Sequence, residues 1–321
     1  MSSDKLRIGI IGVGSIANAA HFPAFAMMDD VEIVGVLGRN RNESEVQAKK
    51  HGIPFVAGDL KELMDQKLDA AVLLTPKYVR REYLEPLLAA KLDVLVEKPL
   101  ASTLQECEAL ADISAKSGQI VMVAFNRRYS PVTQRGVAEF ADKKPHLMVA
   151  SKSREFKEYR ATLENSIHMV DMMRYVMGEC HDVQAESGWT IDELHEDYCA
   201  AKLSFDHGVG MLCASREAGQ WYERMELFGG NKTVIIESPD RLTIVRPDYE
   251  EVYNSTPLKK GWANYVEQIG FYPCDRHFIE CVKTRQKPLT SAEDALKTHQ
   301  LMNEILRKVG LPDLTKEWPH D

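Results

Sequence analysis

Residues 6–17 read LRIGIIGVGSIA, and this stretch decides the fold of the first part of the chain. An apolar run typical of a buried strand passes directly into a Gly-x-Gly-x-x-Ala loop, and a helical pattern follows. Gly12 permits a tight turn, Gly14 lets the backbone approach a pyrophosphate, and Ala17 allows close packing of helix on strand. The pyrophosphate would meet free N–H groups at the helix N-terminus, at Ser15 and Ile16. The loop therefore predicts a dinucleotide site, with a merely tight strand–helix turn as the alternative.

Short apolar runs alternate with helical patterns as far as residue 125. We expect strands at 6–13, 31–38, 69–76, 93–99 and 119–125, and helices at 15–28, 43–52, 81–91 and 103–118. Continuous apolar strands that alternate with helices are typical of a parallel sheet covered on both faces. The fold class predicted for residues 1–125 is thus α/β, a doubly wound, dinucleotide-binding Rossmann domain.

The pattern changes after residue 125. Helices are expected at 131–141, 166–178, 274–285 and 291–310, with strand patterns between them. Asp206-His207-Gly208 and Gly229-Gly230-Asn231 are hairpin signals within alternating segments. Residues 126–321 are therefore predicted to form a second, α+β domain with a large, mostly antiparallel open sheet.

The composition excludes several classes of function. The 321 residues carry a net charge of −8, which argues against nucleic acid or an anionic membrane as partner, because phosphate binding needs concentrated positive charge. No apolar run approaches the roughly 18 residues of a membrane span, and the N-terminus has no signal-peptide pattern. The six cysteines are scattered, without a Cys-x-x-Cys pair or a His/Cys cluster. We therefore expect reduced thiols, no metal site and a cytoplasmic location.

The end of the second expected strand bears on the choice between NAD and NADP. An acid there would hold the ribose 2′-hydroxyl of NAD, but residues 37–41 read LGRNR and contain none. Gly38 leaves room for a 2′-phosphate, Arg39 can donate a forked pair of hydrogen bonds to it, and Arg41 can support it. NADP(H) is therefore favoured over NAD(H), with solvated loop arginines as the alternative.

Two polar features are candidates for chemistry. Lys98 follows a strand at the sheet edge where ligands bind, and an ammonium there can stabilise charge that develops during hydride transfer. A solvated lysine before a proline explains that position equally well. In a helix that begins near residue 164, one face carries four polar side chains, Glu164, His168, Asp171 and Tyr175. His168 can exchange a proton with an alcohol while a carboxylate fixes its tautomer; a solvated helix face is the alternative.

Taken together, these motifs resemble the Gfo/Idh/MocA family of NAD(P)-dependent oxidoreductases. The resemblance rests on IGIIGVGSIA at 8–17, Thr75-Pro76, VEKP at 96–99 and SIHMVD at 166–171. It covers essentially the whole chain. FNRRYSP at 125–131 and RHFIECV at 276–282 are similar to the MviM-like branch of the family.

Several expectations follow from the resemblance alone. Family members pair a dinucleotide-binding domain with a C-terminal α/β domain whose open sheet often forms the oligomer interface, which implies a homo-oligomer, dimer or tetramer. Their substrates are usually sugars, cyclitols or related polyols. The resemblance assigns catalysis to Lys98 and His168, with Glu164 and Asp171 beside the histidine. It extends the expected cofactor site to Thr75, Pro76, Glu97, Lys98 and Asn126.

The chain departs from the family pattern at two positions. Glu164 stands where much of the family has an aspartate, four residues before the histidine. Arg80 replaces the usual histidine after the Thr-Pro segment. Both departures point to altered chemistry or an altered substrate.

The leading interpretation is reversible hydride transfer between C4 of NADP(H) and a hydroxyl- or carbonyl-bearing carbon of a sugar-like substrate. Lys98 would polarise the reacting oxygen, and His168 would move the proton, oriented by Glu164 or Asp171. The basic residues that flank the presumed cleft in sequence could recognise an anionic group; they are Arg127, Arg128, Arg154 and Lys157. Two alternatives stay open: a non-catalytic dinucleotide-binding sensor on the same fold, and a reductase of the biliverdin type.

Overall fold

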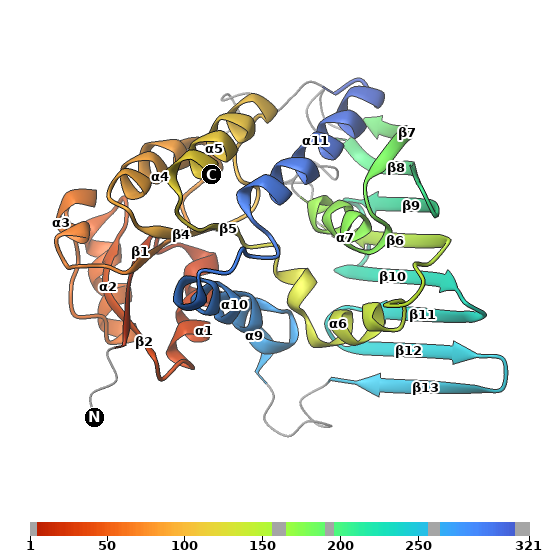
Figure 1. Cartoon of the computed structure of the whole chain (residues 1–321), viewed down its shortest axis with the longest axis horizontal. Coiled ribbons are helices and arrows are strands. Elements are labelled where there is room, and N and C mark those ends of the chain that lie inside the picture. The colour runs from red at the N-terminus through yellow and green to blue at the C-terminus, as the bar shows by residue number, and fades with distance from the viewer. Residues whose placement is uncertain (1–4, 156–164, 190–195, 256–263, 312–321) are drawn as a thin grey trace. The chain divides into compact units, whose positions relative to one another are not determined.

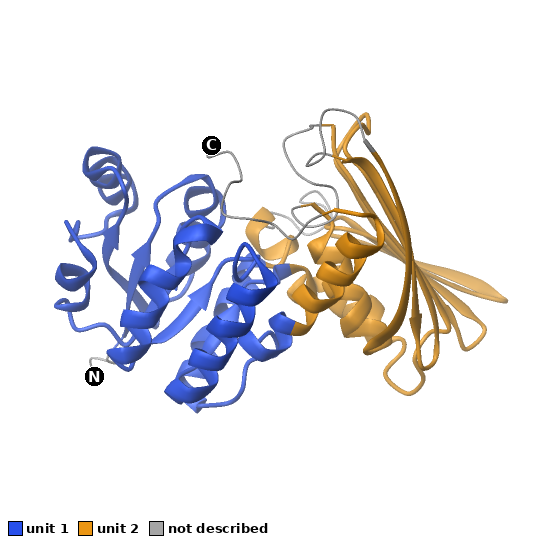
Figure 2. Ribbon diagram, turned by 90° about the horizontal axis from the view of Figure 1, so that it is seen from above, with its two compact units in different colours: residues 1–126, 271–296 blue, residues 127–270, 297–321 orange. Residues whose placement is uncertain are grey.

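The computed structural model describes residues 5–155, 165–189, 196–255 and 264–311. The chain divides into two compact units, which Figure 2 colours separately. Unit 1 comprises residues 1–126 and 271–296, and unit 2 comprises residues 127–270 and 297–321. The chain therefore returns to unit 1 near its end. The contiguous domains 1–125 and 126–321 expected from the sequence stay a prediction.

Unit 1 is built on a five-stranded parallel sheet, as the continuous apolar runs predict. The strands run in the order β2-β1-β3-β4-β5. They are β1 (Leu6–Ile11), β2 (Val31–Leu37), β3 (Ala70–Leu73), β4 (Asp93–Val96) and β5 (Val121–Val123). Every residue of β3, β4 and β5 is buried, because helices cover both faces of such a sheet. The α/β Rossmann fold class is confirmed.

The order of the strands reverses between β1 and β3. Val56 adds an isolated parallel bridge to Val36 of β2, which makes it the outermost member of the sheet on that side. Ligands of doubly wound sheets bind beyond the carboxyl ends of the strands, at the point where the order reverses. The glycine loop follows β1 and Thr75-Pro76 follows β3. Both segments therefore lie at the expected ligand position.

Two helices of unit 1 start and stop at recognisable caps. α2 (Arg41–His51) follows Asn40, whose side chain accepts a hydrogen bond from the backbone of Glu43, and ends at Gly52 in the left-handed region. Gly52 is thus the stop that the sequence predicts. α5 (Leu104–Ser117) is capped by Thr103 in the same way. The other helical segments are η1 (Ala17–His21), α1 (Phe22–Ala26), α3 (Leu60–Met64), η2 (Lys77–Val79), α4 (Arg80–Ala89) and α10 (Phe271–Thr284).

α10 belongs to unit 1 although it lies late in the sequence. It packs against α1 and η1, and Figure 1 shows α10 and α1 on one side of the sheet, with α4 and α5 on the other. The segment after α10 extends the sheet, because the carbonyl of Thr290 accepts a hydrogen bond from Val123 at 2.8 Å. Ser291 also bridges Met122. The last part of the chain therefore completes the nucleotide-binding unit.

Gly12 has a backbone conformation that other residues adopt only with strain. Its φ is 100°, and a Cβ there would lie 2.8 Å from the carbonyl carbon and oxygen of Leu74. The chain thus turns sharply as it leaves β1 and passes close to the end of β3. Gly14, by contrast, has no atom within 4 Å of a Cβ position. Ala17 is fully buried, as close helix–strand packing requires.

Unit 2 is built on an eight-stranded sheet, with the order β13-β12-β11-β10-β6-β9-β8-β7. Its strands are β6 (Leu147–Ser153), β7 (Cys180–Trp189), β8 (Glu196–Phe205), β9 (Gly208–Ser215), β10 (Tyr222–Gly229), β11 (Lys232–Glu237), β12 (Arg241–Arg246) and β13 (Tyr249–Asn254). Among the described strands of this second sheet, only the pair of β6 with β9 is parallel. The predicted large, mostly antiparallel sheet is confirmed, and both predicted hairpin turns connect neighbouring strands.

Helices cover one face of this sheet. α6 (Pro131–Ala138) packs on β11 and β12, and α7 (Ile167–Met177) packs on β6 and β9. In Figure 2 the opposite face of the sheet carries no helix among the described residues. The remaining helical segments are η3 (Asn126–Tyr129), α9 (Tyr265–Gln268) and α11 (Ala292–Lys308).

None of the helices described in the structure is long and apolar enough to cross a lipid bilayer.

The turn at Gly12 predicts a difference between two glycine substitutions. We expect Gly12→Ala to destabilise the protein by about 1–3 kcal/mol, because alanine is strained at positive φ and its Cβ would meet Leu74. Gly14→Ala is the matched control, since it meets no neighbour, and its stability should stay within about 1 kcal/mol of the wild type. Urea unfolding of both variants measures this. Equal stabilities would contradict the expectation.

Candidate active site

The backbone of the glycine loop is held by Asn18, a residue outside the glycine pattern. The side-chain amide of Asn18 donates hydrogen bonds to the carbonyls of Val13 at 2.9 Å and Gly14 at 3.0 Å. The ring of His51 bonds to the Asn18 oxygen at 3.0 Å. These bonds fix the peptide planes of the loop before a ligand arrives, as an anion site built from backbone N–H groups requires.

Two observations fit a dinucleotide at this loop. The space above Gly14 is open, so a pyrophosphate can approach the backbone there. The hydroxyl of Thr75, in the loop after β3, is buried and has no hydrogen-bond partner within the described part of the chain. A buried hydroxyl of this kind needs a ligand or a water to complete its hydrogen bonding. Of the other predicted cofactor residues here, Ser15 and Pro76 are exposed.

Gly38 has a packing reason besides the predicted one. A Cβ there would overlap Oγ of Ser44 and lie 2.8 Å from a methyl group of Val13, so a larger residue would separate α2 from the glycine loop. Arg39 is exposed, and Arg41 forms an exposed ion pair with a residue of its own helix. Surface pairs of this kind are weak. Both arginines therefore lie at the surface, as the recognition of a 2′-phosphate requires.

Arg80 joins the two loops that the sequence assigns to the site. It begins α4 and is buried, and its Nε donates to the carbonyl of Thr75 at 3.1 Å. Its Nη2 donates to the carbonyl of Lys98 at 3.5 Å. Burial lowers the pKa of Arg80 to about 10, against the opposing effect of Glu97, so the group stays charged at neutral pH. The arginine that stands here in place of the family's usual histidine thus puts one planar cation between the loop of Thr75 and the loop of Lys98.

The carboxylate of Glu97 is turned into the interior of unit 1. Its Oε1 lies 3.3 Å from Nε2 of His21, and Nδ1 of His21 lies 2.9 Å from Oδ2 of Asp275. All three residues are buried. Burial alone would lower the pKa of His21, but Asp275 and Glu97 together raise it to about 10. His21 is therefore an imidazolium at neutral pH. The carboxylate of Glu97 contacts His21, and binding of the cofactor by Glu97 stays a prediction.

Burial and the histidine have opposite effects on the two acids. Burial raises the pKa of Asp275, and His21 only partly offsets this. Glu97 is buried too, yet its pKa stays below the usual range, because His21, Lys98 and Arg80 together outweigh the burial. The positive charges of His21, Lys98 and Arg80 thus favour an ionised Glu97. Lys98, the next residue in the chain, is half-buried.

In unit 2, α7 holds His168 in a buried position. Every residue of α7 except Tyr175 is buried, so the alternative of a solvated helix face is wrong. The predicted apolar stripe is present, but the polar residues between its members are covered as well. Glu164, which the sequence places beside the histidine, lies outside the described residues.

Asp171 forms a buried ion pair with Arg128. It accepts hydrogen bonds from Arg128 at 2.7 and 2.5 Å and from the hydroxyl of Thr298 at 3.0 Å. Arg174 donates to the same hydroxyl at 2.7 Å. A bidentate pair of this geometry fixes both partners, so Asp171 anchors α7 to η3 and α11. Arg128 serves this pair rather than the anionic ligand expected from the sequence, and orientation of His168 by Asp171 stays a prediction.

A second buried carboxylate, Glu223 of β10, binds Arg127. Arg127 donates two hydrogen bonds to it at 2.7 Å, Lys152 donates one at 2.6 Å, and the indole of Trp221 donates one at 2.7 Å. Burial alone would raise the pKa of Glu223, but the two cations hold it far below its usual range. Arg127 is therefore also part of an internal pair. Of the other basic candidates, Arg154 lies 4.9 Å from the Trp221 ring centre, and Lys157 lies outside the described residues.

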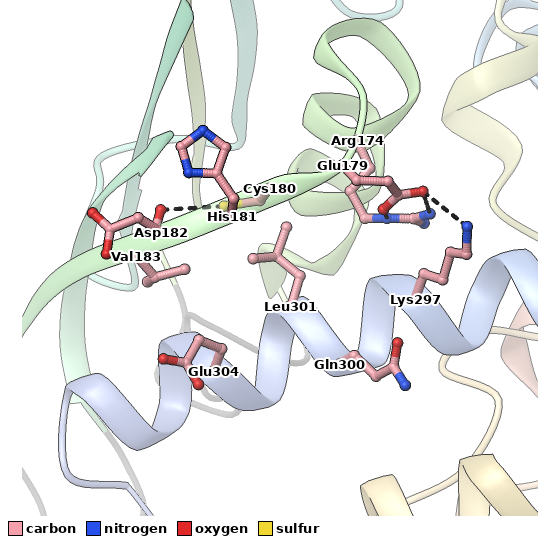
Figure 3. Close-up of a pocket in the computed structure, with 10 residues that line it drawn as sticks. All are labelled: Arg174, Glu179, Cys180, His181, Asp182, Val183, Lys297, Gln300, Leu301 and Glu304. Carbon is pink, nitrogen blue, oxygen red and sulfur yellow. Dashed lines mark hydrogen bonds and ion pairs between the residues drawn. The ribbon is translucent and has the colours of Figure 1, made fainter. Parts of the chain in front are cut away.

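Figure 3 shows a pocket of about 390 Å³ between α11 and the start of β7 in unit 2. Glu179 forms ion pairs with Arg174 and Lys297 on its wall. The residues that line it include neither His168 nor Asp171. Arg174 nevertheless reaches from this wall to Thr298, which bonds to Asp171. The pocket is thus linked to the base of α7 without containing the histidine.

Two family models match the chain. Residues 6–125 match the model described as oxidoreductase family, NAD-binding Rossmann fold, and residues 161–309 match its C-terminal alpha/beta domain. The chain belongs to the Gfo/Idh/MocA family. The resemblance carried by the sequence motifs is thereby confirmed.

Relatives of this Gfo/Idh/MocA protein are oxidoreductases. It is 27% identical to the putative oxidoreductase YceM of Salmonella typhimurium, over 94% of this chain and 97% of that protein. It is 26% identical to the myo-inositol 2-dehydrogenase of Thermotoga maritima, over 90% of this chain and 92% of that one. Its fold matches the MviM dehydrogenase of Clostridium difficile with a TM-score of 0.86 at 24% identity, over 95% and 99% of the two chains. The chain is an NAD(P)-dependent dehydrogenase of this family.

The buried histidine predicts a pH dependence of stability. A pKa of about 10 in the folded state, against 6.5 without the cluster, gives a stabilisation that is complete below pH 6.5 and is lost as the pH rises towards 10. His21→Gln lacks a titrating group. We therefore expect the difference in unfolding free energy between wild type and His21→Gln to shrink by more than about 1 kcal/mol between pH 6.5 and about 9.5.

Urea unfolding across this pH range measures the effect. His207→Gln, in the exposed turn between β8 and β9, is the control and should show no such trend. A difference for His21→Gln that stays constant with pH would contradict an imidazolium at this position.

Proposed function

We propose that the protein transfers a hydride reversibly between C4 of NADP(H) and a hydroxyl- or carbonyl-bearing carbon of a sugar- or cyclitol-like substrate. The observation that carries the proposal is the setting of Lys98. It follows β4 at the carboxyl edge of the sheet, and its carbonyl bonds to the same guanidinium as that of Thr75. The lysine backbone is thereby tied to the loop that borders the expected cofactor position.

The chain's own residues would bind, polarise and move a proton. A bound nicotinamide cofactor supplies or accepts the hydride. The glycine loop, held by Asn18, would bind the pyrophosphate. With an alcohol as substrate, Nζ of Lys98 donates a hydrogen bond to the reacting oxygen and stabilises the negative charge that develops there as hydride leaves. His168 takes the hydroxyl proton, and in the reverse direction returns it to the same oxygen.

The burial of α7 supports His168 in this role. A catalytic group on a helix that is packed on nearly every side is held more precisely than one on a loop. Asp171 already accepts three hydrogen bonds, out of about four that a carboxylate can accept. The proposal keeps Glu164 and Asp171 as the two carboxylates that can orient His168.

The class of substrate rests on the family and its relatives. A relative of nearly equal length bears the name myo-inositol 2-dehydrogenase, which agrees with the polyol substrates that the motifs imply. Direct recognition of an anionic group by Arg127 or Arg128 does not enter the proposal, because both are held in buried ion pairs.

We also propose that the protein is a cytoplasmic homo-oligomer that assembles through the sheet of unit 2. The face opposite α6 and α7 carries small and apolar side chains at its centre, among them Val149, Ala200, Met211 and Cys213. An uncovered face of this kind is typical of a protein–protein interface. The six cysteines, all within the described residues, form no disulfide with one another, which agrees with a reducing compartment.

The mechanism predicts the effects of substitutions at Lys98 and His168. We expect Lys98→Met to lower kcat by roughly 10³-fold, because a donor to the developing oxyanion is lost. His168→Gln should lower it by roughly 10²- to 10⁴-fold. Nicotinamide absorbance with a panel of polyols and keto-sugars measures turnover. The exposed Lys116→Met and His207→Gln are the matched controls.

Undiminished turnover by Lys98→Met would overturn the mechanism. If the wild type binds NADPH yet oxidises or reduces no member of the panel, the non-catalytic sensor becomes the better description.

The acid-free segment at Gly38-Arg39 predicts a preference for NADP(H). A ligand that binds only the folded state raises its stability with the logarithm of its concentration over its dissociation constant. In thermal-shift titrations we expect NADP(H) to stabilise the wild type more than NAD(H). Arg39→Ala should weaken the binding of NADP(H) roughly 10- to 150-fold, with little change for NAD(H), because one charge-assisted fork is worth about 1.5–3 kcal/mol. Arg81→Ala, an exposed arginine of α4, is the control, and stronger stabilisation of the wild type by NAD(H) would refute the preference.

A further inference from the structure

Three buried charged residues in unit 1 have no part in the mechanism above. His21 ends η1, the helical segment that follows the glycine loop, and Glu97 follows β4 directly before Lys98. Asp275 lies on α10, 254 residues from His21 in the sequence. The cluster therefore joins the nucleotide loop, the lysine segment and the late part of the chain.

The backbone of η1 is arranged to place this histidine. Residues Ala17–His21 form a π-helix, a rare conformation that is frequent at functional sites. The wide turn ends at His21, whose ring is completely buried and packs edge-on against Phe271 with ring centres 5.4 Å apart. Phe25 stacks at 6.5 Å. The imidazole thus has apolar neighbours at its sides and a carboxylate at each nitrogen.

The two hydrogen bonds fix both carboxylates in position. A neutral imidazole has one donor nitrogen, whereas the imidazolium has two, so only the charged ring donates to Glu97 and Asp275 together. The imidazolium compensates two carboxylates, so loss of His21 would leave both acids in an apolar interior without this cation, which is strongly unfavourable. Glu97 is therefore held in one orientation, with its carboxylate on the ring of His21.

Because Glu97 and Lys98 are adjacent, the fixed orientation of Glu97 constrains the backbone of Lys98 through a single peptide unit. The backbone N–H of Glu97 donates to the carbonyl of Leu73 at 3.0 Å. On the other side, the carbonyl of Lys98 accepts a hydrogen bond from Arg80. With the Glu97 side chain held by His21, the segment is fixed at three points. The backbone on both sides of the Lys98 α-carbon is thereby held in place.

We propose that His21 and Asp275 are positioning residues, which fix the backbone at Lys98 through the carboxylate of Glu97 and couple it to the helix after the glycine loop. The proposal rests on the function proposed for Lys98. It assigns neither residue any contact with cofactor or substrate.

Two variants and a matched control test the proposal in the full-length protein. Asp275→Asn keeps the shape of the side chain and removes its charge, and His21→Gln removes the imidazolium. Asp93→Asn is the control, because Asp93 is a buried acid at the opposite end of β4. It accepts a hydrogen bond from the Ile120 backbone at 2.8 Å and pairs with Arg285. Its loss should lower stability without disturbing Lys98.

Hydrogen exchange provides a readout that needs no substrate. We expect the backbone amides of residues 97–101 to exchange about tenfold faster in Asp275→Asn and His21→Gln, while those of β1 stay protected. In turnover, kcat should fall at least about tenfold with KM and the dissociation constant of NADP(H) within about threefold, because only the reacting group is misplaced. Asp93→Asn should change neither exchange at residues 97–101 nor kcat.

The possible results distinguish the positioning role of His21 and Asp275 from the reaction proposed for Lys98. If both variants fold and leave the exchange of residues 97–101 unchanged, the positioning role is refuted, and Asp275→Asn decides this even where His21→Gln does not fold. The positioning role is also refuted if kcat falls equally in Asp93→Asn, because loss of stability then explains the effect. Faster local exchange in a protein that turns over no substrate would support the positioning of Lys98 while refuting the proposed reaction.

Discussion

The parallel pairing of β1 with β3 is the constraint on which unit 1 depends. Ile11 lies opposite Leu73 in this pairing, so both strands end at the same level and the loops after them must pass within van der Waals distance. Only glycine at position 12 allows this, because a Cβ would meet the Leu74 carbonyl. The next pairing, of β3 with β4, brings the Glu97 backbone onto the carbonyl of Leu73. The register of the strands therefore makes the segments assigned to cofactor binding neighbours of the segment that carries Lys98.

Much of this fold was predictable from the sequence, because its signals are local. The five parallel strands are short apolar runs, and the helices between them end at residues with specific backbone chemistry, such as Gly52 and Gly118. The pattern of β13, at the edge of the second sheet, is weaker. β13 reads YEEVYN and has no buried residue, so the alternation that reveals a half-buried strand is absent. The assignment of α10 to unit 1 was not predictable either, because an amphipathic helix does not reveal which sheet its apolar face covers.

The candidate site shows the same limit. Lys98 and His168 could be singled out from motifs, but the spacing alone left a solvated face open as the alternative for the polar residues of α7. Asp171 is buried because Arg128 and Thr298, 43 and 127 residues away, satisfy its charge. A buried carboxylate whose cation comes from another element looks the same in the sequence as an exposed one. Arg127 with Glu223, and His21 with Asp275, are further cases. Charge pairing across long sequence separations is thus the part of the site that required the structure.

The late position of α10 has a consequence for synthesis. When the ribosome has released residues 1–126, all five parallel strands exist, but the helix that covers α1 and η1 has not yet been made. His21 and Glu97 then lack Asp275, and β5 lacks the carbonyl of Thr290. Unit 1 is completed only when the whole of unit 2's sheet has already emerged, since β13 precedes α10 in the chain. The nascent first half is thus an incomplete nucleotide-binding fold with uncovered apolar surface, of the kind that chaperones protect until the rest of the chain arrives.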